Sequence, residues 1–242
     1  MDPSDVPPRE RSEVGRSEQG EPEERSMIDV IEQINAVRRR VGVRAIGEGE
    51  ARVVTVSQTY DATIEDVWDA CTNPERIPRW FLPVSGDLRL HGHYQIEGNA
   101  SGTVERCDPP KGFAATWEYG GDVSWIEVRL APEPGRGTRF ELEHTVPADE
   151  HWAEFGPGAT GVGWELGLLG LGLHLASAAP VDPQDVAAWS ASEEGRRFMS
   201  RSSQRWCDAS VAAGADPAEA QAAADRTTAF YTAPPPDGSL ES

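Results

Sequence analysis

Apolar and polar positions alternate with the period of a strand through the middle of this chain and follow a helical period on either side. Between residues 52 and 146, β-prone runs are separated by short turn signals such as Gly98-Asn99 and Gly120-Gly121. Connections this short favour an antiparallel meander. The predicted strands are 52–60, 87–97, 100–107, 112–119, 123–130 and 138–146.

The same alternation predicts which side chains share a face. In 138–146, Phe140, Leu142 and His144 fall on one face, with Glu141 and Glu143 on the other. Two further sets share a face within their own strands: Ala115, Trp117 and Tyr119, and Ile126, Val128 and Leu130.

Residues 59–81 predict two short helices after the first of these strands. Asp61 or Thr63 can cap the first helix. Pro74 suits the first position of the second helix, and Pro78 should end or bend it before an aromatic pair. The apolar stripe of the first helix consists of Ile64, Val67, Trp68 and Cys71.

Helical periodicity also predicts an amphipathic helix over 27–46, with Arg38-Arg39-Arg40 near its C-terminal end. Residues 161–179 are apolar nearly all round, which predicts a helix buried on most sides. The glycines in this stretch weaken a helix, so close packing or a bend must compensate. Because it contains Glu165 and His174, a buried helix fits it better than a membrane span.

The segment 180–232 predicts a helical extension. Asp182-Pro183 and Asp216-Pro217 are matching helix starts, and Ser190-x-x-Glu193 reads as a capping box. We expect the apolar residues that follow to pack on the central domain or on a second subunit; they are Phe198, Met199 and Trp206.

These patterns divide the chain into five parts. Residues 1–26 are polar and predicted to be disordered, with Met1 or Met27 as the start of translation. The other parts are the 27–46 helix, a domain over 47–179, the extension over 180–232 and a mobile tail over 233–242.

The net charge and the cysteine content limit which binding partners and which cellular compartment are expected. The net charge of −19 repels phosphate backbones and anionic lipid, so neither nucleic acid nor a membrane is expected as a partner. Cys71, Cys107 and Cys207 are far apart and lack metal-ligand spacing, as expected of reduced thiols in the cytoplasm. The N-terminus is polar and acidic, unlike a secretory signal.

The order of elements is that of an α+β, helix-grip (START-like) fold. In such a fold a curved antiparallel sheet surrounds a long C-terminal-side helix; here extra N- and C-terminal helices would be added. The segments VWDACTNPERIPRWF, GDLRLHGHYQI, GTVERCDPPKGFAATW, GTRFELEH and GVGWELGLLGL, in that order, resemble the SRPBCC superfamily. Within it, the chain is most similar to the family of the activator of heat-shock protein 90 ATPase, C-terminal-type domain. The resemblance covers 51–178, and His91 departs from it where the family has a glycine pair before the aromatic Tyr94.

The resemblance implies a cavity between the sheet and the long helix, used across the superfamily for apolar ligands. The residues expected to line it, each of which could equally be plain core, are Trp80, Phe81, Trp117, Tyr119, His144, Trp164, Leu168 and Leu171. The family name implies a co-chaperone. However, the eukaryotic activators carry a separate N-terminal domain that contacts the chaperone, and nothing in this sequence resembles it.

The sequence contains few motifs that could indicate a metal site, a nucleotide site or a catalytic site. His91-x-His93 has no third ligand at a telling spacing, so exposed turn histidines are expected rather than a metal site. The segment 156–161 matches G-x-G-x-x-G without a βαβ unit around it, and we interpret it as a loop and helix start. Glu165 suits the start of a helix. His144 is the candidate general base, against the commoner role of a structural histidine.

Three hypotheses about function follow. We favour a binder of a small apolar molecule in the cytoplasm, without catalysis and without a cofactor. The second is an enzyme of the cyclase or hydrolase kind that uses His144, which two or more polar side chains converging on a cavity would favour. The third is a protein-interaction module, for a chaperone or for a homodimer through the C-terminal helices, which a collapsed cavity would favour.

Overall fold

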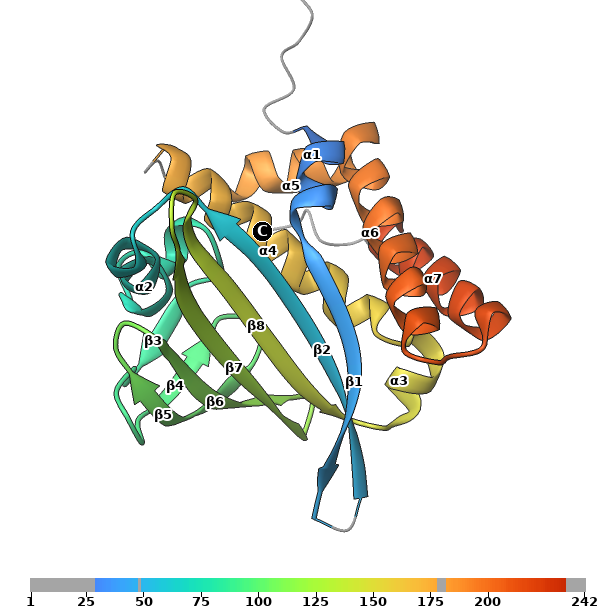
Figure 1. The fold of residues 1–242 in the computed structure, drawn as a ribbon, viewed down its shortest axis with the longest axis horizontal. Helices are drawn as coiled ribbons and strands as arrows, with labels where there is room; N and C mark the ends of the chain where they lie inside the picture. The colour runs from blue at the N-terminus through green and yellow to red at the C-terminus, as the bar shows by residue number, and fades with distance from the viewer. Residues whose placement is uncertain (1–28, 48, 178–181, 234–242) are drawn as a thin grey trace, which may run out of the picture.

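A curved antiparallel sheet forms the centre of the computed structural model, which describes residues 29–47, 49–177 and 182–233. Its eight strands follow the order β1-β2-β8-β7-β6-β5-β4-β3 (Figure 1). The meander predicted from the sequence is confirmed, because β4 to β8 are consecutive neighbours. The strands are β1 Arg38–Ile46, β2 Gly49–Tyr60, β3 Val84–Gly86, β4 His93–Ile96, β5 Ser101–Asp108, β6 Gly112–Tyr119, β7 Asp122–Glu133 and β8 Gly137–Pro147.

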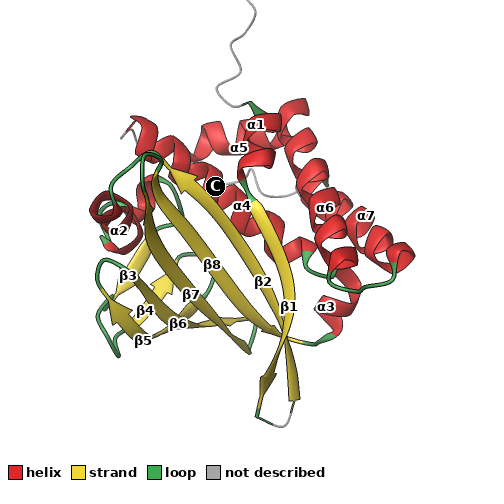
Figure 2. Cartoon of the chain, viewed as in Figure 1, coloured by secondary structure: helices red, strands yellow, loops and turns green. Residues whose placement is uncertain are grey.

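The helices lie behind and beside this sheet in the view of Figure 2. The long helix α4 crosses behind the strands, α2 lies at one end of the sheet, and α6 and α7 lie beside β1 (Figure 1). This is the predicted helix-grip arrangement, which is therefore confirmed. The helices are α1 Val30–Ala36, α2 Ile64–Thr72, the 3₁₀ turn η1 Ile77–Arg79, α3 Glu150–Phe155, α4 Gly158–Ser177, α5 Pro183–Ala191, α6 Glu193–Ala212 and α7 Pro217–Thr232.

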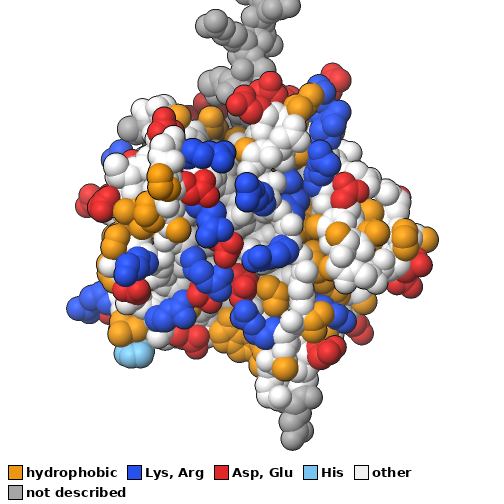
Figure 3. Space-filling view, viewed as in Figure 1, with side chains coloured by type: hydrophobic (Ala, Val, Ile, Leu, Met, Phe, Trp, Pro, Cys, Tyr) orange, Lys and Arg blue, Asp and Glu red, His pale blue; other side chains and the backbone are white. Residues whose placement is uncertain are grey.

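The outer face of the sheet carries charged side chains of both signs, interspersed as Figure 3 shows. Glu141 and Glu143 of β8 point to this face, as their alternation with Phe140 and Leu142 predicts. Arg129 donates to Glu141 at 2.9 Å, and Arg44 lies 2.6 Å from Glu143. The opposite, concave face is therefore the one left for apolar contacts.

The predicted helix over 27–46 is wrong beyond its first part. Among the described residues, α1 ends at Ala36, and Arg38–Ile46 forms β1, paired with β2 from Arg38↔Ser57 to Ile46↔Gly49. The edge of β2 offers a full ladder of backbone hydrogen bonds to this segment. Tertiary pairing of this kind overrides a local helical preference.

Arg39, within the triplet assigned to a helix end, has a specific partner. Its guanidinium donates from Nε to Glu165 Oε1 at 2.6 Å and from Nη2 to Oε2 at 2.5 Å. Its Nη1 also donates to the carbonyl oxygens of Ile34 and Val37. The Glu165 side chain is fully buried, so its role is not to face solvent at a helix start. This ion pair joins α1 and β1 to α4.

The helical segment after β2 differs in detail from its prediction. Thr63, not Asp61, caps α2, because its hydroxyl accepts from the Asp66 amide at 3.2 Å. The second helix is only the 3₁₀ turn η1; Pro74 lies in the turn before it, and Pro78 lies inside it instead of ending it. Proline is accepted there because an amide in the first turn needs no intrahelical acceptor.

The predicted strand 87–97 is interrupted. Regular structure there begins only at His93, while β3 lies earlier, at Val84–Gly86. In the intervening turn, His91 has φ of 66° and donates its amide to the Val104 carbonyl at 2.7 Å. The departure at His91 is thus accommodated in a left-handed conformation that costs a non-glycine residue some strain.

Close packing explains two of the glycines along α4. A Cβ at Gly161 would lie 2.1 Å from the Trp206 ring, and one at Gly170 would lie 2.4 Å from the Trp80 carbonyl oxygen. α4 begins at Gly158, three residues before the predicted start at 161, and its last described residue is Ser177. Within the described residues, no helix combines the length and apolarity needed to cross a bilayer.

The C-terminal helices pack on the central domain of the same chain. Asp182 and Asp216 cap α5 and α7, as predicted. Ser192 caps α6 by accepting from the Gly195 amide, whereas Ser190, the predicted cap, lies inside α5. The apolar residues of α6 contact α4, α1 and β1, and those buried most completely are Phe198, Met199 and Trp206.

Candidate functional site

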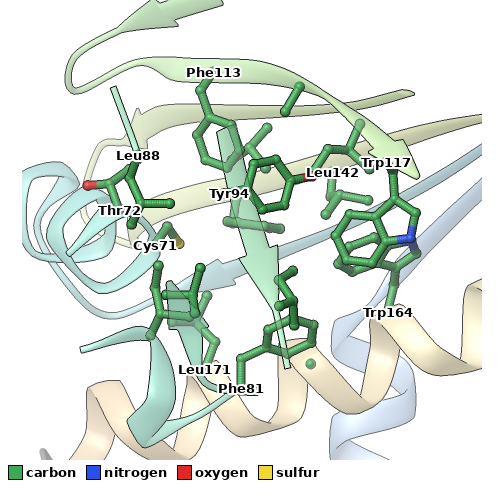
Figure 4. A pocket seen from close by; sticks show the side chains of 18 of the residues that line it. Cys71, Thr72, Phe81, Leu88, Tyr94, Phe113, Trp117, Leu142, Trp164 and Leu171 are labelled. Carbon is green, nitrogen blue, oxygen red and sulfur yellow. The ribbon is translucent and has the colours of Figure 1, made fainter. Parts of the chain in front are cut away.

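An apolar cavity of about 340 Å³ lies between the concave face of the sheet, α2 and α4 (Figure 4). We call it the inner cavity. No Asp, Glu, Lys, Arg or His is among the described residues that line it, which are Val56, Trp68, Cys71, Thr72, Ile77, Trp80, Phe81, Val84, Leu88, Tyr94, Ile96, Val104, Cys107, Phe113, Ala115, Trp117, Ile126, Val128, Phe140, Leu142, Trp164, Gly167, Leu168 and Leu171.

The periodicities of strands and helix place these side chains. Along each strand alternate residues point to the cavity, so β6 contributes Phe113, Ala115 and Trp117 while β7 and β8 contribute two residues each. On α4, Trp164, Leu168 and Leu171 are spaced by four and three residues and therefore share one face. In Figure 4 the strands form one wall of the cavity and α4 the opposite one.

Aromatic rings close one end of the inner cavity. Trp117 meets Trp164 edge-to-face, with ring centroids 5.1 Å apart, and Phe81 stacks on Trp164 at 6.3 Å. Figure 4 shows Trp117 and Trp164 at one end, with Cys71 and Leu88 at the other.

Several polar groups of the wall form hydrogen bonds within the protein. Tyr94 donates its hydroxyl to the Thr116 carbonyl at 2.6 Å, and Thr72 donates to the Trp68 carbonyl at 2.8 Å. The Trp80 indole donates to the Ala70 carbonyl at 2.9 Å. A molecule in the cavity would therefore be held mainly by apolar contact and shape.

Cys71 contributes a buried thiol to this wall. Burial raises its pKa to about 12, although the positive charge of Arg76 opposes this effect. A thiol with such a pKa stays protonated near neutral pH, and the thiolate is the nucleophilic form. Cys71 is therefore an apolar wall residue and not an activated nucleophile.

His144 lies beyond the closed end and is held by hydrogen bonds at both ring nitrogens. The Trp164 indole donates to Nδ1 at 3.0 Å, and Nε2 lies 2.8 Å from Ser124 Oγ. Since an indole only donates, Nδ1 is the acceptor and the Nε2 proton points to Ser124, whose hydroxyl donates to the Trp117 carbonyl. Burial lowers the pKa of His144 to about 4. The ring is thus neutral and fully hydrogen-bonded.

A second pocket, of about 510 Å³, lies on the other side of the same rings. We call it the outer pocket; it shares Phe81, Trp117 and Trp164 with the inner cavity. Tyr119 and His144 line this outer pocket and not the inner cavity. Their assignment to the apolar cavity was therefore wrong; Tyr119, the last residue of β6, is 62% exposed.

The other predicted cavity residues are brought together. Those lining the inner cavity are Trp80, Phe81, Trp117, Trp164, Leu168 and Leu171. Sequence reasoning missed several others, among them Cys71, Tyr94 and Phe113. Phe113 could have been found, because it has the same strand phase as Ala115 and Trp117. Cys71 could have been found from the apolar stripe of α2.

The motifs considered for metal and nucleotide binding lie elsewhere. Across the described residues, no group of three or more His, Cys, Asp or Glu side chains is placed to hold a metal ion. His91 and His93 are exposed, at the turn before β4 and on β4 itself. Residues 156 and 157 join α3 to α4, and 158–161 form the first turn of α4, so a helix and not a strand precedes the glycines.

Comparison with known proteins agrees with this architecture. The family model described as "Activator of Hsp90 ATPase homolog 1-like protein" matches residues 61–172. The crystal structure of CalU16 from Micromonospora echinospora is 37% identical, covers 72% of this chain and 98% of CalU16, and has a TM-score of 0.56. Its solution NMR structure is 38% identical, covers 74% and 97%, and has a TM-score of 0.62.

More distant similarity supports the fold alone. EF2215 from Enterococcus faecalis, a conserved protein of unknown function, is 14% identical with a TM-score of 0.51, covering 74% of this chain and 95% of that protein. The comparison with curated proteins gave no match.

Proposed function

This chain belongs to the Activator of Hsp90 ATPase homolog 1-like family of the SRPBCC superfamily, and on that basis we propose that it binds a small apolar molecule in the inner cavity without catalysis. The observation that carries the proposal is the cavity itself, about 340 Å³ in volume and lined by apolar and aromatic side chains. Sites for small ligands typically run from about 300 to 1,000 Å³ with walls of this kind. Each Å² of apolar ligand surface removed from water contributes roughly 25 cal/mol.

The chemistry of the wall supports binding rather than turnover. General acid–base catalysis needs a titratable group within hydrogen-bond reach of the substrate. The candidate for that role, His144, lies outside the inner cavity and has both ring nitrogens engaged. Cys71 is kept protonated by burial. The cyclase or hydrolase alternative thus has no favourable observation among the described residues that line the inner cavity.

The interaction-module alternative is also less well supported. A collapsed cavity would favour this alternative, whereas the inner cavity retains a volume of about 340 Å³. The apolar residues of α6 pack within the chain and do not call for a second subunit. The proposed location is the cytoplasm, in keeping with three cysteines that are all free.

A set of leucine-to-phenylalanine variants on α4 tests the proposal. Leu168 and Leu171 line the inner cavity, whereas Leu169 is buried in the core and does not. Leu168→Phe and Leu171→Phe should be tolerated, because the added ring enters empty space. Leu169→Phe is the control and should cost about 1–3 kcal/mol of unfolding free energy by overpacking.

Binding is measured with N-phenyl-1-naphthylamine, a neutral apolar dye that fluoresces on leaving water. The parent protein should bind the dye, and the Leu168→Phe/Leu171→Phe double variant should bind it several-fold more weakly, with its melting temperature retained. If the parent binds no dye and all three single variants are equally destabilised, the cavity is not usable and the interaction module becomes the better hypothesis. Native mass spectrometry of the purified parent would reveal a co-purified molecule.

A further inference from the structure

The outer pocket is built from parts of the chain that are far apart in sequence. The β6–β7 turn, the end of β8, α3, the start of α4 and the end of α7 surround a volume of about 510 Å³. Its described lining includes Trp117, Tyr119, Asp122, Asp149, Phe230 and Tyr231.

Aromatic rings dominate this lining. Tyr119 is 62% exposed and Phe230 is 60% exposed, so much of each ring faces water. Phe230 contacts Tyr231 edge-to-face at 5.2 Å, and Trp117 and Trp164 form the floor that separates the outer pocket from the inner cavity. Aromatic faces carry a negative quadrupole potential and attract cations within about 6 Å of the ring centroid.

The charge of the outer pocket has the same sign as these ring faces. Asp122 and Asp149 are exposed carboxylates in the lining, and no Lys or Arg is among its described residues. His144 adds no positive charge near neutral pH, because burial lowers its pKa to about 4. The net charge of −19 on the chain adds a long-range attraction for cations.

We propose that the outer pocket binds an organic cation, a quaternary or protonated amine, through its aromatic faces and the carboxylates of Asp122 and Asp149. An anion would be repelled by the two carboxylates. A hard metal ion would need several oxygen ligands converging on one point, and the described residues form no such cluster. A fully apolar molecule in the outer pocket would have to desolvate the two carboxylates, which costs free energy. It avoids this cost in the inner cavity, whose described lining carries no charged side chain. The proposal does not depend on what the inner cavity holds.

Matched probes separate charge from shape. Phenyltrimethylammonium and tert-butylbenzene have the same outline, but only the first is charged. We expect the cation to bind about tenfold or more tightly than the uncharged isostere, and its affinity to fall as salt is raised. Binding is followed by tryptophan fluorescence and isothermal titration calorimetry on the full chain.

Variants assign the binding to the outer pocket. Asp122→Asn/Asp149→Asn should weaken cation binding by about fivefold or more while leaving isostere binding unchanged. Asparagine retains the Asp149 cap of α3, so the fold should be preserved. Tyr119→Leu removes an exposed ring and should also weaken cation binding. The control Asp185→Asn/Glu193→Gln changes the charge equally at exposed positions outside the pocket and should have little effect.

Three results would overturn the proposal: no binding of the cation at millimolar concentration, equal affinity for cation and isostere, or equal weakening by the control pair. The Leu168→Phe/Leu171→Phe variant distinguishes the two pockets. Cation binding that survives in this variant, together with no dye binding by the parent, would support the outer site and contradict the apolar binder. Dye binding without cation binding would do the reverse.

Discussion

Three features of the surroundings of His144 favour its neutral ring: the Trp164 indole, the Ser124 hydroxyl and the loss of water. The indole donates to Nδ1, so that nitrogen cannot take a proton without breaking the bond. Burial removes the hydration that would stabilise an imidazolium. A histidine in this setting orients Trp164 and Trp117 at the boundary between the two pockets, which is a structural role.

The pH dependence of stability should reveal this neutral state. The pKa of His144 is about 4 in the folded chain against an ordinary value of 6.5, so the unfolded chain binds more protons between these values. Stability should therefore fall as pH drops from about 6.5 to about 4, by about 3 kcal/mol from this residue alone. Urea unfolding at several pH values measures the slope.

His144→Gln removes this titration, so its stability should fall less than that of the parent over the same pH range, whatever its stability at pH 7. His91→Gln, at an exposed turn, is the matched control and should keep the parent slope. Equal slopes for the parent and His144→Gln would show that the ring protonates freely in the folded chain.

At the scale of single elements, α4 is shaped by its contacts on two sides. Trp206 of α6 presses against it at Gly161, and the η1 region presses against it at Gly170. The side chains of Trp164, Leu168 and Leu171 face the inner cavity. Both glycines lower helical propensity. Each allows a close neighbour: Trp206 at Gly161 and, at Gly170, the backbone of Trp80, which lines the inner cavity.

Two alanine variants on α4 should have opposite effects. A Cβ at Gly161 would lie 2.1 Å from the Trp206 ring, so Gly161→Ala should displace that ring. The expected loss of unfolding free energy is about 1–3 kcal/mol, the usual cost of overpacking. A Cβ at Gly167 would lie 3.7 Å from the Phe81 ring, an ordinary contact. Gly167→Ala should therefore gain up to about 1 kcal/mol from helix propensity. Thermal and urea unfolding of both variants measure the difference; destabilisation of equal size would contradict the packing described for Gly161.

For the whole molecule, the C-terminal helices complete the core instead of forming a separate unit. Phe198 and Trp206 are fully buried, and they belong to the same cluster of buried residues as Val54 and Leu171. The Arg39–Glu165 ion pair joins the N-terminal elements to α4 in a similar way. Breaking a buried pair by removing one partner costs about 3–5 kcal/mol.

Ending the chain at Ala179 should expose the faces of α1, α4 and β1 that α6 covers. We expect the shortened protein to aggregate or to lose most of its stability, because a contiguous apolar surface becomes accessible to solvent. Size-exclusion chromatography and thermal unfolding measure both effects. A chain ending at Thr232 retains α5 to α7 and is the control. A shortened protein that remained monomeric and equally stable would show that the helices are dispensable for the fold.

Short-range patterns in the sequence were sufficient to predict much of the architecture. The faces of β6, β7 and β8, the caps at Asp182 and Asp216, and the helix-grip order follow from alternation, helical spacing and turn signals, all of which act over a few residues. Most of the predicted cavity residues, such as Trp117 and Leu168, line the inner cavity because strand phase and helix face determine which way a side chain points.

What only the tertiary structure decided depends on residues distant in sequence. Arg38–Ile46 is a strand because β2 lies beside it, and Glu165 is buried because Arg39, 126 positions away, reaches it. Tyr119 and His144 have the strand phase of cavity residues, but the rings of Trp117 and Trp164 place them in a different pocket. Periodicity specifies the face of the strand from which a side chain points, whereas the boundary between the two pockets depends on the rings of Trp117 from β6 and Trp164 from α4, which line both.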